Sequence, residues 1–539
     1  MRKLILTYHT LKHLRPIQVR YQLLYRIKKV WEAVVGSKFT MFIPAEIFPL
    51  TLSQWIDKPQ SLDASTFTFL NQSEEYPVAI DWNERRNGKL WAYNLNYMDY
   101  LVQEDMSFEQ GIELLWSFVE NQSSNNVGYE PYPIALRGIN WIKFLSKHNA
   151  QYGDNKAITN SLYSQYLILE DNLEYHLMGN HLLENAFSLL FGAFYFNDVL
   201  MFSVSEGLLK SELKEQVLND GAHFELSPMY HQIILDRLLD CINLLQNNQR
   251  FDNQKLLLDL LLGVSAKMLR WLNAMTFSDG SIPLFNDSTR GIAPATMQLN
   301  EYAKRLGLLD VPTHNKYKLD DSGYRRFESC DYELFVDVGA VGPDYIPGHA
   351  HADTFNFHLR ANNKDIIVDT GISTYNKNAC RQKERSTSAH NTVQYGNYEQ
   401  SEVWGGFRVA RRAKIISLLE NGNRITAVHD AYKRFGVWHE RSFNCSSHDI
   451  VIVDTMRGAI SEECTARFHL APNQKPRISN NIITLEDAQI LFLGASSINI
   501  VTYYCALEFN LIQTSECLEI KFQRQLTTKI KINAHTISY

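Results

Sequence analysis

The chain has 539 residues, of which 45% are hydrophobic and 12% aromatic, and its 53 basic side chains are opposed by 59 acidic ones. This apolar content excludes a disordered or collagen-like protein, and the length is enough for several domains with large cores. The net charge of −6 argues against a basic nucleic-acid-binding protein. Seven cysteines without a CxxC pair are typical of reduced core residues rather than of disulfides or a thiolate zinc site.

The first 40 residues form a basic arm, because they hold nine basic residues and a single acidic one. We expect an amphipathic helix that packs on the domain through Leu14, Val19, Leu23 and Ile27, and the alternative is contact with anionic lipid or polysaccharide. The apolar runs of the arm are too short for a signal peptide, and no window of the chain is apolar enough to span a membrane. A cytoplasmic protein is therefore expected, with a periplasmic location or secretion by another route as the alternative.

Apolar residues recur at helical spacing through residues 1–320. Ser107 with Gln110 three residues later marks one helix start, and Ser227 before Pro228 marks another. Further helical runs are expected at 136–147, 160–176, 181–193 and 254–275. So many helices without strands between them predict an all-α domain, and their number suits a toroid of helical hairpins.

The pattern changes to period two in residues 321–539. Residues 354–360 alternate between apolar and polar, 361–364 suit a turn, and 365–369 return as a partner strand. Similar short strands are expected at 332–338, 391–395, 407–418, 449–454, 489–493, 498–503 and 518–522. We therefore expect an antiparallel β-sandwich, joined to the helical domain near residues 310–325.

Histidines cluster around the first strands of the predicted sandwich. Residues 348–353 read GHAHAD, so His349 and His351 point to the same face of an extended chain. The predicted hairpin returns Asp369 towards His351, and His390 follows shortly after. Two imidazoles and a carboxylate suit zinc or another borderline divalent ion, whereas the simpler alternative is that each histidine is satisfied separately within the sheet.

A second polar cluster lies in the helical half. Residues 179–185 read GNHLLEN, which places Asn180, His181 and Glu184 on one helical turn. An apolar helix that begins with such a polar turn either caps itself or lines a cleft.

Two further side chains are candidates for chemistry. Tyr230 falls in the first turn of its predicted helix, where the amide dipoles favour a phenolate and would lower its pKa. Arg137 lies among aromatic residues, which suits a carboxylate clamp on a sugar or a structural ion pair.

Together these motifs resemble the heparinase II/III family of polysaccharide lyases, and the resemblance covers essentially the whole chain. The segments that carry it are GNHLLENA, ELSPMYH, GHAHADTFNFHL, IIVDTG, RSTSAHNTV and EVWGGFRVARRA. The resemblance implies an N-terminal incomplete (α/α) toroid followed by a C-terminal antiparallel β-sandwich. It also implies β-elimination on an acidic polysaccharide that contains uronic acid, such as heparan sulfate, hyaluronan, chondroitin or a related bacterial polymer.

The resemblance assigns roles to the catalytic candidates. Tyr230 matches the family's catalytic tyrosine, which acts as base or acid according to the epimer at C5, and His349 matches the catalytic histidine. The position that neutralises the uronate carboxylate matches Asn180 or His181, and the sequence does not choose between them.

The same resemblance supplies the remaining site residues. Substrate contacts are expected from Arg137, Glu184, Arg385 and Trp404. The metal-holding positions match His351, Asp369 and His390, with zinc as the first choice and manganese or calcium as alternatives, and no organic cofactor is expected.

Charge within the predicted sandwich supports an acidic partner. Residues 380–414 hold seven basic residues and three acidic ones, so a positive region exists despite the negative total. Two alternatives to a lyase remain: a glycoside hydrolase with paired carboxylates, and a non-catalytic protein of capsule or exopolysaccharide metabolism.

Overall fold

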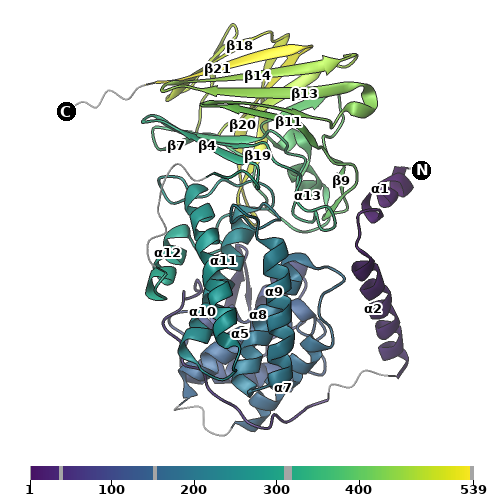
Figure 1. Ribbon diagram of the computed structural model, residues 1–539, viewed down its shortest axis with the longest axis vertical. Coiled ribbons are helices and arrows are strands. Elements are labelled where there is room, and N and C mark those ends of the chain that lie inside the picture. The colour runs from purple at the N-terminus through teal and green to yellow at the C-terminus, as the bar shows by residue number, and fades with distance from the viewer. Residues whose placement is uncertain (1, 36–39, 150–154, 309–317, 534–539) are drawn as a thin grey trace, which may run out of the picture.

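The computed structural model describes residues 2–35, 40–149, 155–308 and 318–533 and shows helices followed by antiparallel sheets (Figure 1). The expected fold class, a helical toroid followed by a β-sandwich, is confirmed. The described helices are α1 (Arg2–Leu11), α2 (Pro16–Val35), α3 (Lys89–Tyr97), α4 (Phe108–Glu120), α5 (Pro131–Lys147), α7 (Lys156–Glu170), α8 (Gly179–Phe196), α9 (Val199–Gln216), α10 (Pro228–Asn247), α11 (Gln254–Ala274), α12 (Thr296–Arg305) and α13 (Ala379–Glu384).

Helices α5, α8 and α10 form the inside of the helical part. Every residue of α8 except His181 is buried, as expected for a helix that is apolar on all sides and surrounded by others. The caps that the sequence predicts are present, since the Ser107 side chain accepts a hydrogen bond from the Gln110 amide and Ser227 accepts one from the Tyr230 amide. The second cap places Tyr230 in the first turn of α10.

The C-terminal part contains three larger sheets whose strands pair antiparallel. The eight-stranded sheet has the order β11 (Ile415–Asn421), β12 (Arg424–His429), β13 (Val437–Cys445), β14 (Asp449–Gly458), β21 (Gln525–Ile532), β18 (Ala488–Leu493), β17 (Ile482–Thr484) and β16 (Arg477–Ser479). One four-stranded sheet has the order β19 (Ser497–Glu508), β20 (Leu511–Phe522), β15 (Cys464–His469) and β8 (Val393–Tyr395). The other has the order β4 (Tyr324–Glu328), β5 (Tyr332–Asp337), β6 (Phe357–Ala361) and β7 (Lys364–Ile367).

These sheets enclose one apolar core. Val336, Phe443 and Leu518 come from three different sheets and are buried in the same cluster. The large sheet therefore packs over the two smaller ones as a sandwich, with its strands forming the layer farthest from the helices (Figure 1). Two minor sheets consist of β1 (Leu62–Asp63), β2 (Thr66–Phe69) and β3 (Gln72–Glu75), and of β9 (Val403–Trp404) and β10 (Arg408–Val409).

One strand starts later than its sequence pattern predicts. The alternation begins at residue 354, but β6 begins at Phe357 because Phe355 has a positive φ of 71° and forms a turn. The change from helices to strands falls between Arg305, where α12 ends, and Tyr324, where β4 begins. The predicted boundary around residues 312–314 lies outside the described residues, so its position stays a prediction.

The basic arm consists of α1 and α2 and lies along the side of the molecule (Figure 1). It docks through Gln18, which is buried, and of the four predicted apolar residues only Leu14 is half-buried. Val19, Leu23 and Ile27 are exposed, so the expected packing of the arm through these three side chains is wrong. Across the described part of the chain, helices long and apolar enough to cross a bilayer are absent.

Candidate active site

A cleft of about 1660 Å³ lies where the helical part meets the loops of the sandwich. Asn180 and His181 reach it from the first turn of α8, and Tyr230 reaches it from the first turn of α10. His349 and Tyr375 reach it from sandwich loops. All four predicted catalytic residues therefore line one cleft. Tyr375 lines it too, although no sequence pattern pointed to this residue.

Tyr230 and His349 are in direct contact within the cleft. Their ring centroids are 4.0 Å apart, and the Tyr230 hydroxyl lies 3.2 Å from the Tyr375 hydroxyl. Burial raises the pKa of Tyr230, and this effect exceeds the lowering expected from the helix terminus. The prediction of a lowered tyrosine pKa is therefore wrong, and Tyr230 holds its proton at neutral pH.

His349 is oriented by a buried carboxylate. Its Nδ1 lies 2.8 Å from Asp287 Oδ2, and Arg381 Nη2 donates to the same oxygen at 2.6 Å. Burial alone would favour the neutral acid, but Arg381 and the histidine N–H groups hold the pKa of Asp287 well below its ordinary value. An ionised carboxylate only accepts hydrogen bonds, so His349 carries its proton on Nδ1 and keeps the Nε2 lone pair for chemistry.

The loop that carries Asp287 joins the two halves of the site. Asn286 adopts a positive φ of 54° and donates from Nδ2 to the Leu226 carbonyl at 3.0 Å. The Ser227 hydroxyl donates to the Asp287 carbonyl at 2.8 Å, and the Asp287 amide donates to the His349 carbonyl at 3.1 Å. The loop thus fixes the start of α10 against the loop that carries His349. Nothing in its local sequence marks it as part of the site.

Asn180 is held by a second buried carboxylate, Glu225. Its Nδ2 lies 3.0 and 2.9 Å from the two Glu225 oxygens, and its backbone amide donates to Oε1 at 3.1 Å. Gly179 allows this approach, because its φ is +57° and a Cβ there would lie 2.7 Å from Glu225 Oε1. Glu225 Oε2 also lies 3.6 Å from His349 Nε2. Glu225 belongs to the segment ELSPMYH, so its motif was recognised although its role was not.

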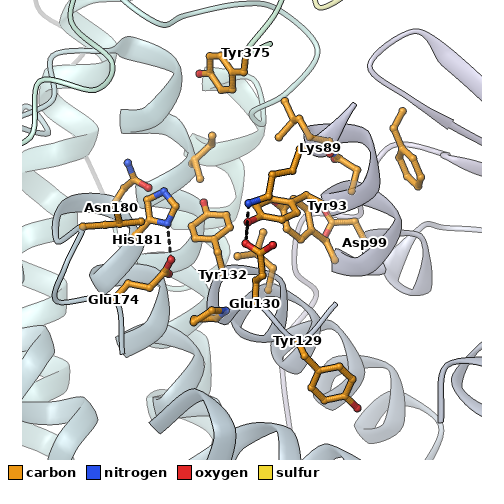
Figure 2. A pocket seen from close by; sticks show the side chains of 18 of the residues that line it. Lys89, Tyr93, Asp99, Tyr129, Glu130, Tyr132, Glu174, Asn180, His181 and Tyr375 are labelled. Atoms are coloured by element: carbon orange, nitrogen blue, oxygen red, sulfur yellow. Dashed lines mark hydrogen bonds and ion pairs between the residues drawn. The ribbon is translucent and has the colours of Figure 1, made fainter. Parts of the chain in front are cut away.

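His181 lies at the same helix start and faces a different carboxylate (Figure 2). Its Nδ1 is 3.1 Å from Glu174 Oε1, and Asn185 Nδ2 donates to Glu174 Oε2 at 3.1 Å. Burial opposes the charged imidazole, but Glu174 outweighs it and raises the pKa of His181. The Tyr132 ring packs on the imidazole at 4.5 Å between centroids.

The opposite wall of the cleft carries Lys89, Tyr93 and Glu130 (Figure 2). Lys89 Nζ pairs with Glu130 Oε2 at 2.8 Å. Seven cationic side chains and five carboxylates line the cleft. Lys28, Lys58, Lys89 and Arg237 pair with carboxylates. The excess positive charge therefore comes from Lys29, Arg85 and Lys377, for which the described residues show no ion pair. An anionic chain is therefore the ligand that this lining favours.

Two predicted substrate contacts are buried in the helical core instead. Arg137 is fully buried and donates to Gln165 Oε1 at 2.8 Å and to the Asn96 and Gly128 carbonyls at 2.9 and 2.7 Å. Glu184 is also fully buried, 3.6 Å from Arg237. Burial raises the pKa of Glu184 to about 7. Both substrate predictions are wrong, because neither side chain reaches the cleft.

The other two predicted substrate contacts, Arg385 and Trp404, form hydrogen bonds to other segments of the protein. Arg385 is buried and donates to the Ala350 carbonyl at 2.7 Å and to the Gly406 carbonyl at 2.6 Å. The Trp404 indole N–H donates to Thr10 of α1 at 3.1 Å. Neither residue lines the cleft, and Arg385 is buried, so the structure does not place either one against a ligand bound in the cleft.

The positive region at residues 380–414 is largely used in internal pairs. Arg411 pairs with Glu402 at 2.9 Å, and Arg412 pairs with Asp344 at 2.8 Å. Since Arg381 and Arg385 are also buried, this segment supplies little free charge to the cleft. The cleft cations come mainly from other segments.

The predicted metal ligands His351, Asp369 and His390 are all buried. The two imidazole centroids are 5.2 Å apart. His351 Nε2 lies 2.7 Å from Asp287 Oδ1, and His390 Nδ1 lies 2.9 Å from Asp369 Oδ2. The remaining nitrogens, His351 Nδ1 and His390 Nε2, are buried without a hydrogen-bond partner, which is the donor chemistry that a borderline divalent ion accepts.

The third predicted ligand is arranged differently. Asp369 accepts hydrogen bonds from His390, from the Gly371 amide at 3.1 Å and from Asn356 Nδ2. Over the ranges that the structure describes, no group of three or more His, Cys, Asp or Glu side chains is gathered as a metal site. The complete three-ligand set is therefore not assembled, and the fit to an ion rests on the two histidine nitrogens.

Comparison with known proteins agrees with this architecture. A model of the heparinase II/III N-terminus matches residues 132–307, and a model of the heparinase II/III-like C-terminal domain matches residues 311–535. The crystal structure of a heparinase III superposes with a TM-score of 0.64 at 16% identity, covering 86% of this chain and 81% of that chain. At this identity the superposition shows a shared fold.

Two curated relatives are heparin-sulfate lyases. The one from Pedobacter heparinus is 25% identical over 35% of this chain and 31% of its own length. The one from Bacteroides stercoris is 25% identical over 53% of this chain and 45% of its own length. The match thus spans less than half the length of either relative. With both family models matched in order along a shared fold, this chain belongs to the heparinase II/III family.

Proposed function

We propose that this protein cleaves a polysaccharide containing uronic acid by β-elimination and leaves a 4,5-unsaturated uronate at the new end. The observation that carries the proposal is the stacking of Tyr230 on His349 in the cleft, at 4.0 Å between ring centroids. A proton donor and a proton acceptor in contact are what the reaction needs at one sugar ring.

The elimination removes a proton from C5 and breaks the bond to the O4 leaving group. His349 suits the base, because Asp287 keeps the imidazole proton on Nδ1 and leaves Nε2 free to accept. Tyr230 keeps its proton and suits the acid that protonates O4. For the other epimer at C5, Tyr230 first gives its own proton to solvent, then accepts the C5 proton and passes it to O4, so that it serves as both base and acid.

The C5 proton becomes acidic only when the adjacent carboxylate is neutralised, because the intermediate resembles an enolate. His181 offers a charge for this, since Glu174 raises its pKa. Asn180 is the alternative, but its amide already donates to Glu225, which also lies next to His349, so Asn180 would have to redirect part of that hydrogen bonding to the uronate. The two residues predict different behaviour of KM with pH, because only the imidazole of His181 changes its charge near neutral pH.

A divalent ion, with zinc as first choice, would be held by the open nitrogens of His351 and His390. When bound, it would add positive charge next to the loop that carries His349 and would fix that loop in place. Metal analysis of the purified protein, with melting temperature before and after chelation, tests this. An intact protein with no bound metal and no chelator effect would refute it, and His351→Ala should abolish binding.

The experiment that tests this proposal incubates the protein with a panel of acidic polysaccharides, chosen from the charge of the cleft and from the relatives. Because both curated relatives are heparin-sulfate lyases, heparin and heparan sulfate come first, followed by hyaluronan, chondroitin and alginate. Ultraviolet absorbance detects the C4=C5 double bond, and a parallel assay counts reducing ends. We expect absorbance to rise with at least one polymer.

Variants make the assay specific. Tyr230→Phe and His349→Ala should each lower the rate about 100-fold or more, because each removes a proton-transfer group. Tyr504→Phe is the matched control, since Tyr504 is 62% exposed on the sandwich. Reducing ends without absorbance would indicate a hydrolase, and polymer binding without either product would indicate a non-catalytic protein. Full activity in both active-site variants would refute the mechanism.

A further inference from the structure

The outer face of α2 is an exposed apolar stripe. Val19, Leu23, Ile27 and Val30 recur at helical spacing and are 44, 54, 66 and 66% exposed. Trp31 continues the stripe at 67% exposure. Exposing an apolar face of this length to water is unfavourable in free energy, so we expect a binding partner to cover it.

The opposite face of α2 fixes the helix to the body. Gln18 Nε2 donates to the Leu177 carbonyl at 3.2 Å, and the Tyr25 hydroxyl donates to the Leu173 carbonyl. The apolar stripe therefore points away from the helical part, on the side of the molecule where the arm lies (Figure 1).

Helix α1 repeats the arrangement. Leu4, Tyr8 and Leu11 are spaced four and three residues apart and are 75, 66 and 54% exposed. The arm thus presents two consecutive amphipathic helices. A shallow hollow at their junction is lined by Leu14, Pro16 and Leu24, among others.

The charged residues of this arm are basic except for Glu32, near the end of α2. Residues 2–31 contain no Asp or Glu. Lys3, Lys12, Arg20, Arg26 and Lys29 are all exposed. On α2 the arginines lie next to the apolar stripe, where their long stems can lie on apolar surface while the charged ends reach phosphate groups.

We propose that α1 and α2 dock this protein on an anionic phospholipid surface, with the apolar stripe in the headgroup region and the cations on lipid phosphates. A membrane surface would interact favourably with both the apolar stripe and the predominantly positive charge of the arm. An anionic polysaccharide would leave the apolar stripe in water. A second copy would bring two positive arms together.

The docked arm also lies at the cleft, because Tyr25, Lys28 and Lys29 line it from the same helix. Docking would hold the cleft close to the bilayer surface. The proposal does not depend on the reaction performed there, so its test measures binding alone.

The test is cosedimentation of the full chain with vesicles of phosphatidylcholine, with and without phosphatidylglycerol. We expect binding to the mixed vesicles that weakens with added salt, and little binding to phosphatidylcholine alone. The triple variant Leu23→Ser, Ile27→Ser and Trp31→Ser should lower the partition coefficient at least about tenfold. It removes the three largest side chains of the α2 stripe, and therefore much of the apolar area that docking would bury in the lipid. All three residues are exposed, so folding should be unaffected.

Two controls complete the design. The variant Val199→Ser with Leu200→Ser removes side chains that are 65 and 76% exposed on α9, and it should bind as the unmodified chain does. Arg20→Gln with Arg26→Gln should weaken binding to the mixed vesicles only. Failure to sediment, equal binding to both vesicle types, or a dimer that the triple variant abolishes in the absence of vesicle binding would each overturn the proposal.

Discussion

At Asp287 a single buried carboxylate accepts hydrogen bonds from His349, His351 and Arg381. Asp287→Asn keeps the shape, but an amide that donates to Nδ1 would move the histidine proton to Nε2 and remove the base. We expect kcat to fall at least about 100-fold. Because Arg381 loses its counter-charge, the free energy of unfolding should fall by about 3 kcal/mol.

The sandwich contains a matched control for this loss of stability. Asp454 is equally buried and accepts from His439 Nε2 at 2.7 Å and from Arg441 Nη2 at 3.0 Å. Asp454→Asn should cost similar stability and leave the rate per folded molecule unchanged. Rates normalised to the folded fraction, with thermal melts, separate the two effects. If both variants lost activity equally, Asp287 would have only a structural role.

The pair of His181 and Glu174 predicts a pH dependence. The His181 pKa is raised above its ordinary 6.5, so the pair stabilises the fold fully below that value and loses its effect as pH rises through the raised pKa. If the imidazolium neutralises the uronate, KM should rise over the same pH range. Glu174→Gln removes the cause of the shift, so the rise in KM should move to lower pH. A KM profile identical to that of the unmodified chain would assign neutralisation to Asn180.

At the scale of elements, the start of α8 is the most constrained feature. Gly179 combines a φ of +57° with a Cβ position 2.7 Å from both Glu225 Oε1 and Ile346 Cδ1. Gly179→Ala should cost about 1–2 kcal/mol of stability and shift Asn180 away from Glu225, which lowers activity. Gly207→Ala on α9 is the control, since a Cβ there meets no atom within 4 Å. It should be neutral or stabilising by up to about 1 kcal/mol. Equal effects of the two substitutions on activity would contradict this account.

The same elements show what a sequence can reveal. Serine caps such as Ser227 carry a local signal, and helices and strands appear through their periods, so the two-part fold could be predicted from local patterns. Tyr230 and His349, which line the cleft, were selected as catalytic residues only through motifs that resemble those of the family. At the start of α8 the N-cap residue Met178 supplies no side-chain cap, and the Asn180 amide donates instead to Glu225, 45 residues away. This start also depends on a positive φ at Gly179, which no local pattern indicates.

The residues that support the site were harder to find. Asp287 contacts a histidine 62 residues away, through a loop without periodicity. Such contacts exist only once both parts have packed together. Arg137 was misassigned for the converse reason, because an arginine among aromatic residues has the same local sequence whether it faces a cleft or, as here, the core.

At the scale of the whole molecule, a net charge of −6 coexists with a cleft in which cations outnumber carboxylates. If the substrate is a polyanion, raising the ionic strength from about 0.05 to about 0.5 M should lower kcat/KM roughly tenfold, because exposed charges are screened over a shorter distance. Lys377 lines the cleft from the sandwich side, whereas Lys210 pairs with Glu206 on α9 at 2.8 Å. Lys377→Gln should therefore reduce the salt dependence, and Lys210→Gln should leave it unchanged. Equal salt dependence in the two variants would show that the overall field of the protein, rather than the cleft, attracts the substrate.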